Sequence, residues 1–279
     1  MATHTFTIPK DSLTKSQLVI LEYIYSNIET IPFLSITELS NELGISDATI
    51  TRFSKKVGYP SFKEMKMAIF SDIQVSPAKK LQNSFEEGDL NAKDNLLIFK
   101  EIQHLIETVS HLDMQTLNQA IHLLLKAKKI YVFAKGAAKS PADLLVFRLN
   151  RFDLDIQLVT ASGSELFEKL NNLSQEDAIV LFGFGSVPRE IKLVEDYGKK
   201  IKVPILSFAD RHYNSTSEEG VTTFFVARGL PDDYHSMTSV VALIDTLIVE
   251  MAKQMPEERK QHLENLFSLK EEYKHTIPR

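Results

Sequence analysis

The stretch that decides the first domain consists of two short helical segments separated by a glycine. Residues 34–53 read LSITELSNELGISDATITRF. Ser35 followed three residues later by Glu38 is the capping-box pattern, in which the serine accepts an amide N–H and the glutamate reaches back. Gly44 is the residue type that ends a helix in the left-handed conformation. These helix-start and helix-end residues predict two short helices joined by a tight turn.

The second helix, expected over 46–57, has an apolar stripe and an opposite polar face. Ile50, Phe53 and Val57 recur at helical spacing, so they are predicted to pack against the helix over 36–43. The pair has helix-turn-helix proportions, and small residues, threonines and an arginine on the polar face suit contact with a DNA major groove. The expected DNA-binding residues are Ser46, Ala48, Thr49, Thr51, Arg52, Lys55 and Lys56.

Charge is unevenly distributed along the 279 residues. The net charge of −5 argues against a nucleic-acid binder when it is taken as an average. Residues 1–80, however, hold nine basic and eight acidic residues, while the remainder holds 23 basic and 29 acidic residues. Lys63 and Lys66 extend the basic stripe beyond the second helix. This split favours a DNA-binding domain joined to an acidic domain, although a plain helical bundle with a solvated charged face would show the same pattern.

Helix-breaking residues and composition predict the domain boundaries. The Ser76-Pro77 pair stops a helix, and a polar, acidic segment follows it. We expect a helix-turn-helix domain over 1–76, a linker over 77–94, an α/β domain over 95–255 and a helical tail over 256–279. The tail could pack on a neighbouring subunit or on its own domain.

Short apolar runs alternate with helical segments in the second domain. The runs lie at 130–134, 156–159, 178–182, 204–208 and 221–226, and several end in or near glycine. Alternation of this kind predicts a parallel five-stranded sheet with helices on both faces, in a flavodoxin- or Rossmann-like sandwich.

Several of these stretches resemble a known family. The string over 34–53, the Lys56-Val57-Gly58-Tyr59 run, and the segments 126–133, 177–180 and 237–245 resemble the RpiR family of bacterial transcription regulators. The resemblance implies a winged-helix-like helix-turn-helix domain whose recognition helix is 46–57. It also implies a C-terminal sugar isomerase (SIS) domain, so the expected partners are a double-stranded DNA operator and a phosphosugar or other anionic effector.

The resemblance implies a phosphosugar pocket at the loops after the first and third strands. In the family these loops read Gly-x-Gly-x-Ser and Ser-x-Ser-Gly-x-Thr, whereas this chain has Ala138 in the first and Pro188 at the end of the second. The pocket could bind an anion through backbone amides and side chains such as Lys135, or it could be vestigial, leaving a domain that only dimerises. The expected ligand-binding residues are Gly136, Ala137, Ala138, Lys139, Ser140, Gly183, Gly185, Ser186, Arg189 and His235.

Other classes of function fit the sequence less well. A SIS-fold sugar-phosphate isomerase is the alternative, and Glu165, Glu190 or His235 would be its general base. Both glutamates also fit ordinary acids of a helix first turn, so no catalytic residue is predicted. The chain has no cysteine and no histidine cluster with metal-ligand spacing, so no metal site is expected. Gly183-x-Gly185 lacks the third glycine of a dinucleotide fingerprint, so no cofactor is expected either.

The sequence also suggests where and how such a regulator would work. It shows no signal peptide and no run of ~18 apolar residues, and the absence of cysteine fits the cytoplasm. We therefore expect no membrane partner. A homodimer or homotetramer is expected, because two symmetry-related recognition helices would grip a roughly palindromic operator.

Overall fold

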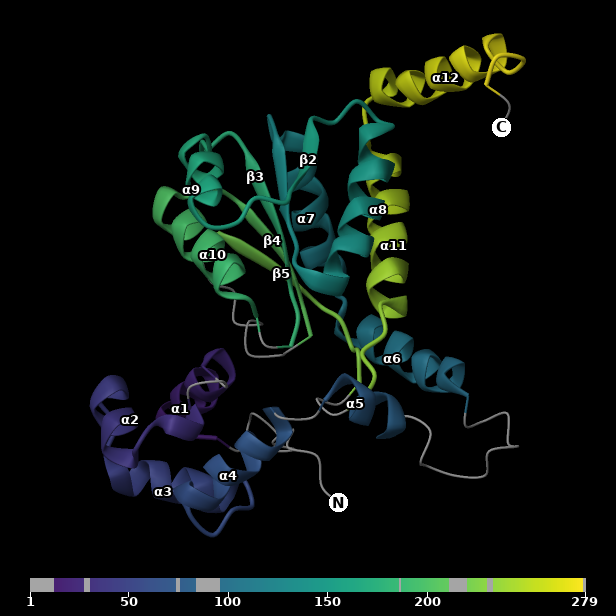
Figure 1. Cartoon of the computed structure of the whole chain (residues 1–279). Coiled ribbons are helices and arrows are strands. Elements are labelled where there is room, and N and C mark those ends of the chain that lie inside the picture. Colours follow the sequence, from purple (N-terminus) through teal and green to yellow (C-terminus); the bar gives the residue numbers. More distant parts are fainter. Residues whose placement is uncertain are drawn as a thin grey trace. The chain divides into compact units, whose positions relative to one another are not determined.

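The computed structural model describes residues 13–27, 31–73, 76–83, 96–185, 187–210, 220–229 and 233–277. By its contacts the chain divides into two compact units. The first comprises residues 1–100 with 229–236, and the second comprises 101–228 with 237–279. Figure 1 shows the elements of both units in order along the chain. Among the described residues, no helix is both long and apolar enough to cross a membrane.

The N-terminal unit is built from short helices. They are α1 (Lys15–Ser26), the 3-10 helix η2 (Ile31–Phe33), α2 (Ile36–Leu43), α3 (Asp47–Lys56), α4 (Phe62–Ile73) and α5 (Pro77–Asn83). The two predicted helices of the helix-turn-helix are thus confirmed as α2 and α3. No strand occurs in the described part of residues 13–83, so the helix-turn-helix core lacks a β wing there. Helix α5 falls within the predicted linker, whose residues 84–94 lie outside the described part.

Side-chain caps explain where α2 and α3 begin. The Ser35 Oγ accepts the Glu38 amide N–H at 3.1 Å, and the Glu38 carboxylate accepts the Ser35 N–H at 2.7 Å. This confirms the predicted capping box, and these bonds lower the pKa of Glu38. Gly44 ends α2 with φ 63°, a conformation that costs glycine little. Ser46 then caps α3 by accepting the Thr49 N–H.

A small apolar core orients α3. Ile50 and Phe53 are fully buried, as is Leu39 of α2. They pack in one cluster with buried side chains of the neighbouring helices, including Ile20 of α1 and Met65 of α4. Because this stripe faces inward, the opposite face of α3 is turned to solvent.

The second unit contains the predicted parallel sheet. Its strands are β1 (Ile130–Phe133), β2 (Ile156–Val159), β3 (Ala178–Gly183), β4 (Ile205–Ala209) and β5 (Val221–Phe225). All neighbours pair in parallel, in the order β2-β1-β3-β4-β5. This is the flavodoxin-like order, and each predicted strand is confirmed with its ends within one residue.

Helices cover both faces of this sheet (Figure 1). Those that pack on it are α7 (Met114–Lys126), α8 (Lys139–Asn150) and α11 (Thr238–Gln254) on one face, and α9 (Ser164–Asn171) and α10 (Arg189–Ile201) on the other. The other helical elements of this part of the chain are α6 (Leu97–His111), the 3-10 helix η4 (Gly136–Ala138) before α8, and α12 (Glu257–Glu272), which has no buried residue. Alternate β1 side chains serve the two faces: Val132 joins the core formed with α7, α8 and α11, while Tyr131 joins the core formed with α9 and α10. The sheet therefore has a packed layer of helices on each face, and the loops that could form a site lie at the ends of its strands.

Candidate functional site

The outer face of α3 presents a basic and polar surface. Ala48, Arg52, Lys55 and Lys56 are exposed, while Thr49 and Thr51 are half-buried. Two of these basic residues, Lys55 and Lys56, lie in the last turn, where a cation is favoured by the helix dipole. The predicted DNA-binding residues therefore lie along the full length of α3, from its N-cap to its last turn.

Hydroxyl groups at the start of α3 are already hydrogen-bonded within the helix. The Ser46 Oγ lies 2.9 Å from the Thr49 Oγ1, and the Arg52 Nη2 donates to that same oxygen at 3.3 Å. Ser46 therefore caps α3, and the Arg52 side chain is directed along the helix edge. A guanidinium has five N–H donors, so Arg52 keeps others for a base or a phosphate.

Two lysines of the basic stripe also support the scaffold. The Lys56 Nζ donates to the Gln17 Oε1 at 3.4 Å and so links α3 to the cap of α1. Lys66 was expected to extend the exposed stripe, but it is half-buried and donates to the carbonyls of Pro32 and Leu34. Lys66 therefore adds positive charge beside α3 while its amine is held by the carbonyls around η2. A shallow cavity of ≈ 310 Å³ beside Thr51 is lined in part by Lys63 and Lys66.

The loop after β1 has an exposed part and a buried part. Gly136, Ala137, Lys139 and Ser140 are exposed. Ala138, at the position where the family pattern has serine, is buried and its methyl joins the core between the sheet and α8. No hydroxyl could occupy that position without a buried hydrogen-bond partner.

Lys135, the other candidate of this loop, is engaged by its own chain. Its Nζ donates to the Ser162 Oγ at 2.6 Å and to the Ala161 carbonyl at 3.2 Å. It also lies 3.6 Å from the Glu190 carboxylate, whose pKa is lowered by its own backbone amide and by the Lys135 charge. Glu190 stands in the first turn of α10, as Glu165 does in α9. A lowered pKa and a paired lysine make Glu190 a weak general base.

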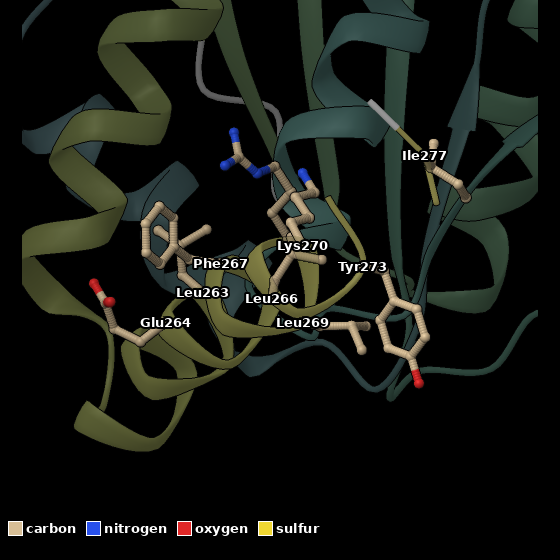
Figure 2. A pocket seen from close by; sticks show the side chains of 9 residues that line it. Leu263, Glu264, Leu266, Phe267, Leu269, Lys270, Tyr273 and Ile277 are labelled. Atoms are coloured by element: carbon tan, nitrogen blue, oxygen red, sulfur yellow. The ribbon is translucent and has the colours of Figure 1, made fainter. Parts of the chain in front are cut away.

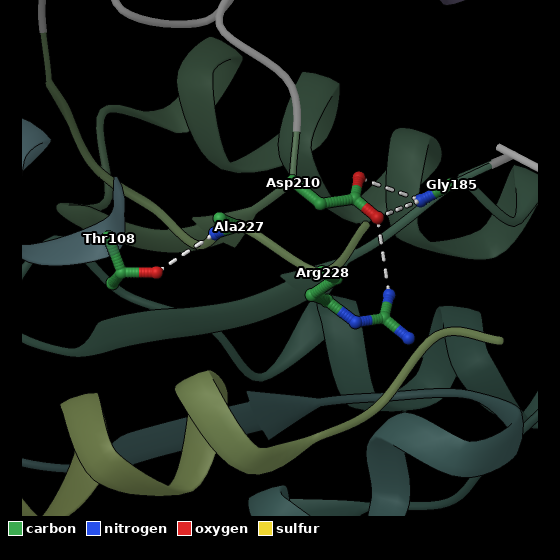
Figure 3. A network of polar contacts seen from close by, with 5 residues as sticks. All are labelled: Thr108, Gly185, Asp210, Ala227 and Arg228. Carbon is green, nitrogen blue, oxygen red and sulfur yellow. Dashed lines mark hydrogen bonds and ion pairs between the residues drawn. The ribbon is translucent and has the colours of Figure 1, made fainter. Parts of the chain in front are cut away.

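The loop after β3 is closed by a carboxylate. Gly183 is the last residue of β3 and is buried, and the next residue, Phe184, packs against the core. The Gly185 N–H donates to both oxygens of Asp210, at 2.8 and 3.0 Å (Figure 3). Asp210 also pairs with Arg228, whose Nη1 lies 3.2 Å from it. The Gly185 N–H, which is predicted to bind an external anion, therefore already binds the Asp210 carboxylate of the same chain.

The remaining predicted ligand-binding residues are dispersed. Arg189 is exposed at the start of α10. His235 is half-buried in the segment 229–236, which groups with the N-terminal unit rather than with the sheet. Ser186 lies outside the described residues.

A separate surface cavity of ≈ 960 Å³ follows α12 (Figure 2). Its lining is mostly apolar: Arg151, Leu263, Glu264, Leu266, Phe267, Leu269, Lys270, Tyr273 and Ile277. No residue of α12 is buried, and Phe267 is 53% exposed. The Arg259 guanidinium tethers the start of the helix to the carbonyls of Phe152 and Asp153. This apolar surface is unlike the predicted anion site and lies on different elements.

Comparison with known proteins identifies the N-terminal domain. Residues 4–76 match the helix-turn-helix domain of the rpiR family. An HTH-type transcriptional regulator of Clostridium perfringens is 24% identical over 262 residues, which cover 88% of this chain and 90% of that protein. The HTH-type transcriptional regulator HexR of Pseudomonas aeruginosa is 23% identical and covers 86% of this chain and 84% of its own.

Solved structures show that the second unit has the SIS fold. The sugar isomerase domain of the RpiR transcription factor from Sphaerobacter thermophilus superposes with a TM-score of 0.56 at 19% identity, over 61% of this chain and 96% of that one. Vibrio vulnificus NanR, complexed with ManNAc-6P, gives a TM-score of 0.55 at 19% identity, over 93% of this chain and 94% of its own. The chain thus joins a domain that matches the rpiR helix-turn-helix model to a unit that has the fold of a SIS domain.

Sequence reasoning missed Asp210 and Arg228. A signal for Asp210 existed, because it directly follows β4, and β4 pairs with β3 in a register that sets Ala209 opposite Gly183. Polar residues just after neighbouring parallel strands meet at the same edge of a sheet. Arg228 carries a weaker signal, since it follows the end of β5 by three residues.

Proposed function

We propose that this chain is a DNA-binding transcription regulator that reads its operator with α3. The observation that carries the proposal is the exposed basic face of α3, held outward by the buried Ile50 and Phe53 in a domain of the rpiR family. In this arrangement Arg52 contacts a base or a phosphate, and Lys55 and Lys56 contact the backbone. A regulator of this kind acts on chromosomal DNA in the cytoplasm and carries out no catalysis.

The test of this proposal is a binding titration with labelled DNA from the promoter of the chain's own gene. Arg52→Ala and Lys55→Ala each remove a positive group from α3, so we expect Kd to rise about 5–150-fold for Arg52→Ala. Lys55→Ala should weaken binding to all DNA sequences. It should also reduce the slope of the logarithm of the binding constant against the logarithm of the salt concentration by the amount of about one phosphate contact. Lys128→Ala, which changes an exposed lysine of the SIS unit, is the matched control. Equal affinities for all four proteins would refute the role of α3.

The SIS domain is proposed to sense a phosphosugar or another anionic metabolite through the loops after β1 and β3. The two strands are parallel neighbours, so their loops leave the same edge of the sheet. NanR, which has this fold, is complexed with ManNAc-6P, and here Lys139, Ser140 and Arg189 are exposed cation and hydroxyl donors near those loops. A panel of phosphosugars should raise the Tm of the full chain if the pocket binds one. No rise across the panel would favour a vestigial pocket.

Two copies of the chain are proposed to associate, as a homodimer or in a homotetramer, with α12 contributing to the contact. A 16-residue helix is marginal in water on its own, and α12 has an exposed apolar face without a buried residue. A second copy of the same surface offers matching apolar area around a symmetry axis. Phe267→Glu should therefore lower the sedimentation-derived mass at low protein concentration, whereas Glu264→Gln should not. An unchanged mass for Phe267→Glu would remove α12 from the interface.

A further inference from the structure

One carboxylate joins the ends of three neighbouring strands. Asp210 directly follows β4 and accepts the Gly185 N–H from the loop after β3 (Figure 3). The same side chain pairs with Arg228, which follows β5. Next to Arg228, the Ala227 N–H donates to the buried Thr108 of α6 at 3.0 Å, so the backbone on this side is held as well.

The pair is shielded from water. The Arg228 side chain is 6% exposed and the Asp210 side chain 10% exposed. The Phe184 ring covers the guanidinium, with its centroid 4.4 Å from the Arg228 Cζ. Burial lowers the pKa of Arg228, but the Asp210 charge opposes this and an arginine remains a cation in proteins. Two opposite charges in such surroundings stabilise each other, and the buried Glu101 carboxylate also stabilises the Arg228 charge.

These donors are the ones that bind a phosphate or a carboxylate. A backbone N–H in a loop just before a helix and a guanidinium both donate to anionic oxygens. In this chain the oxygens belong to Asp210. Gly185 and Arg228 therefore supply anion-binding donors, and their anion is Asp210, which directly follows β4.

We propose that Asp210 is an internal anion that determines the ligand specificity of this loop by excluding free phosphate from Gly185 and Arg228. A soluble anion can use these two donors only when the Asp210 carboxylate is absent or displaced. Any effector of the wild-type SIS domain therefore binds through other groups. This inference bears on the effector of the proposed regulator, but it rests on the SIS unit alone and needs no DNA to be tested.

The experiment measures the thermal unfolding of the full chain in sodium phosphate and in sodium chloride of equal ionic strength. Asp210→Ala removes the carboxylate that accepts from Arg228 and from the Gly185 N–H, so we expect its Tm to fall and then to rise by about 3 °C or more at saturating phosphate. Formate, which resembles the lost carboxyl group, should act in the same direction. The wild type should change by less than about 1 °C. The control Asp155→Ala, which removes an exposed acid paired with Lys129, should behave as the wild type does.

A second variant identifies the group that holds the phosphate. Asp210→Ala combined with Arg228→Met removes the buried cation, so its phosphate response should vanish. If Asp210→Ala alone cannot be recovered folded, Asp210→Asn, which keeps the shape and loses the charge, is judged by the same criterion. The proposal is overturned if the wild type responds to phosphate as strongly as the variant, if the variant does not respond, or if the response survives Arg228→Met. Each of these results leaves the DNA-binding proposal untouched.

Discussion

The outer face of α3 and the loops at the carboxyl edge of the SIS sheet use their polar groups in opposite ways. On α3, Arg52 spends one hydrogen bond on Thr49 and faces solvent with the rest of its donors. In the SIS loops, Lys135 and the Gly185 amide are satisfied by groups of the same chain. The difference indicates that the donors on α3 are open to an external partner. In the SIS loops, acceptors of the same chain already occupy positions that ligand oxygens could take.

The largest expected effect concerns the internal pair of the SIS unit. Arg228→Met leaves the Asp210 carboxylate buried without its cation, so we expect a loss of about 3–5 kcal/mol in the free energy of unfolding. Changing both partners, with Asp210→Asn and Arg228→Met together, should recover a large part of this loss because no uncompensated charge remains. Urea denaturation of the three proteins gives the comparison. A loss below about 1 kcal/mol for Arg228→Met would mean that the pair is solvated, and the contrast with α3 would weaken.

A smaller effect separates capping from DNA contact at Ser46. Ser46→Ala removes the cap of α3 and should cost about 1 kcal/mol of stability. Ser46→Asp also caps a helix, so it should keep the stability, but its negative charge should repel DNA phosphates and weaken binding. Unfolding curves and DNA titrations of the two variants are compared side by side. If Ser46→Asp binds DNA like the wild type, Ser46 acts only as a cap and does not lie against DNA.

The smallest expected effect is the pH dependence of one helix cap in the SIS unit. Asp113 caps α7, and its hydrogen bonds from Thr116 lower the pKa of its carboxyl group. Because the pKa is lower in the folded state, the ionised Asp113 carboxylate contributes its full stabilisation above its unfolded-state pKa of about 4. This stabilisation is lost as the pH falls through the folded-state pKa. Asp113→Ala should therefore cost about 0.5–1 kcal/mol at pH 7 and progressively less below pH ~4. Chemical denaturation at several pH values tests this, with the exposed Asp196→Ala as control. A cost that stays constant with pH would show that the charge of Asp113 does not contribute.

Elements whose causes are local could be predicted closely. The capping box of Ser35 and Glu38, the turn at Gly44 and the five strands depend on residues near one another in the chain, and all were found in place. The linker prediction, by contrast, did not anticipate α5. The Ser76-Pro77 pair ends one helix, and Pro77 also begins α5, because proline is favoured in the first turn of a new helix.

The candidate sites were predicted unevenly for the same reason. The face of α3 follows from helical periodicity, since burying Ile50 and Phe53 turns Arg52 and Lys55 outward. The hydrogen bonds of Lys66 do not follow from periodicity, because its carbonyl partners lie on η2 and just after it, more than thirty residues earlier.

Caps, periodicity and apolar runs act over a few residues, so the helix-turn-helix and the parallel sheet could be predicted from the sequence. Which donors remain open to a partner depends on contacts between residues far apart in the chain. Gly185 and Asp210 are separated by 25 residues, and Asp210 and Arg228 by 18. Their meeting depends on the order in which the strands pair, and a buried charge is held there only because the folded chain supplies its counter-charge.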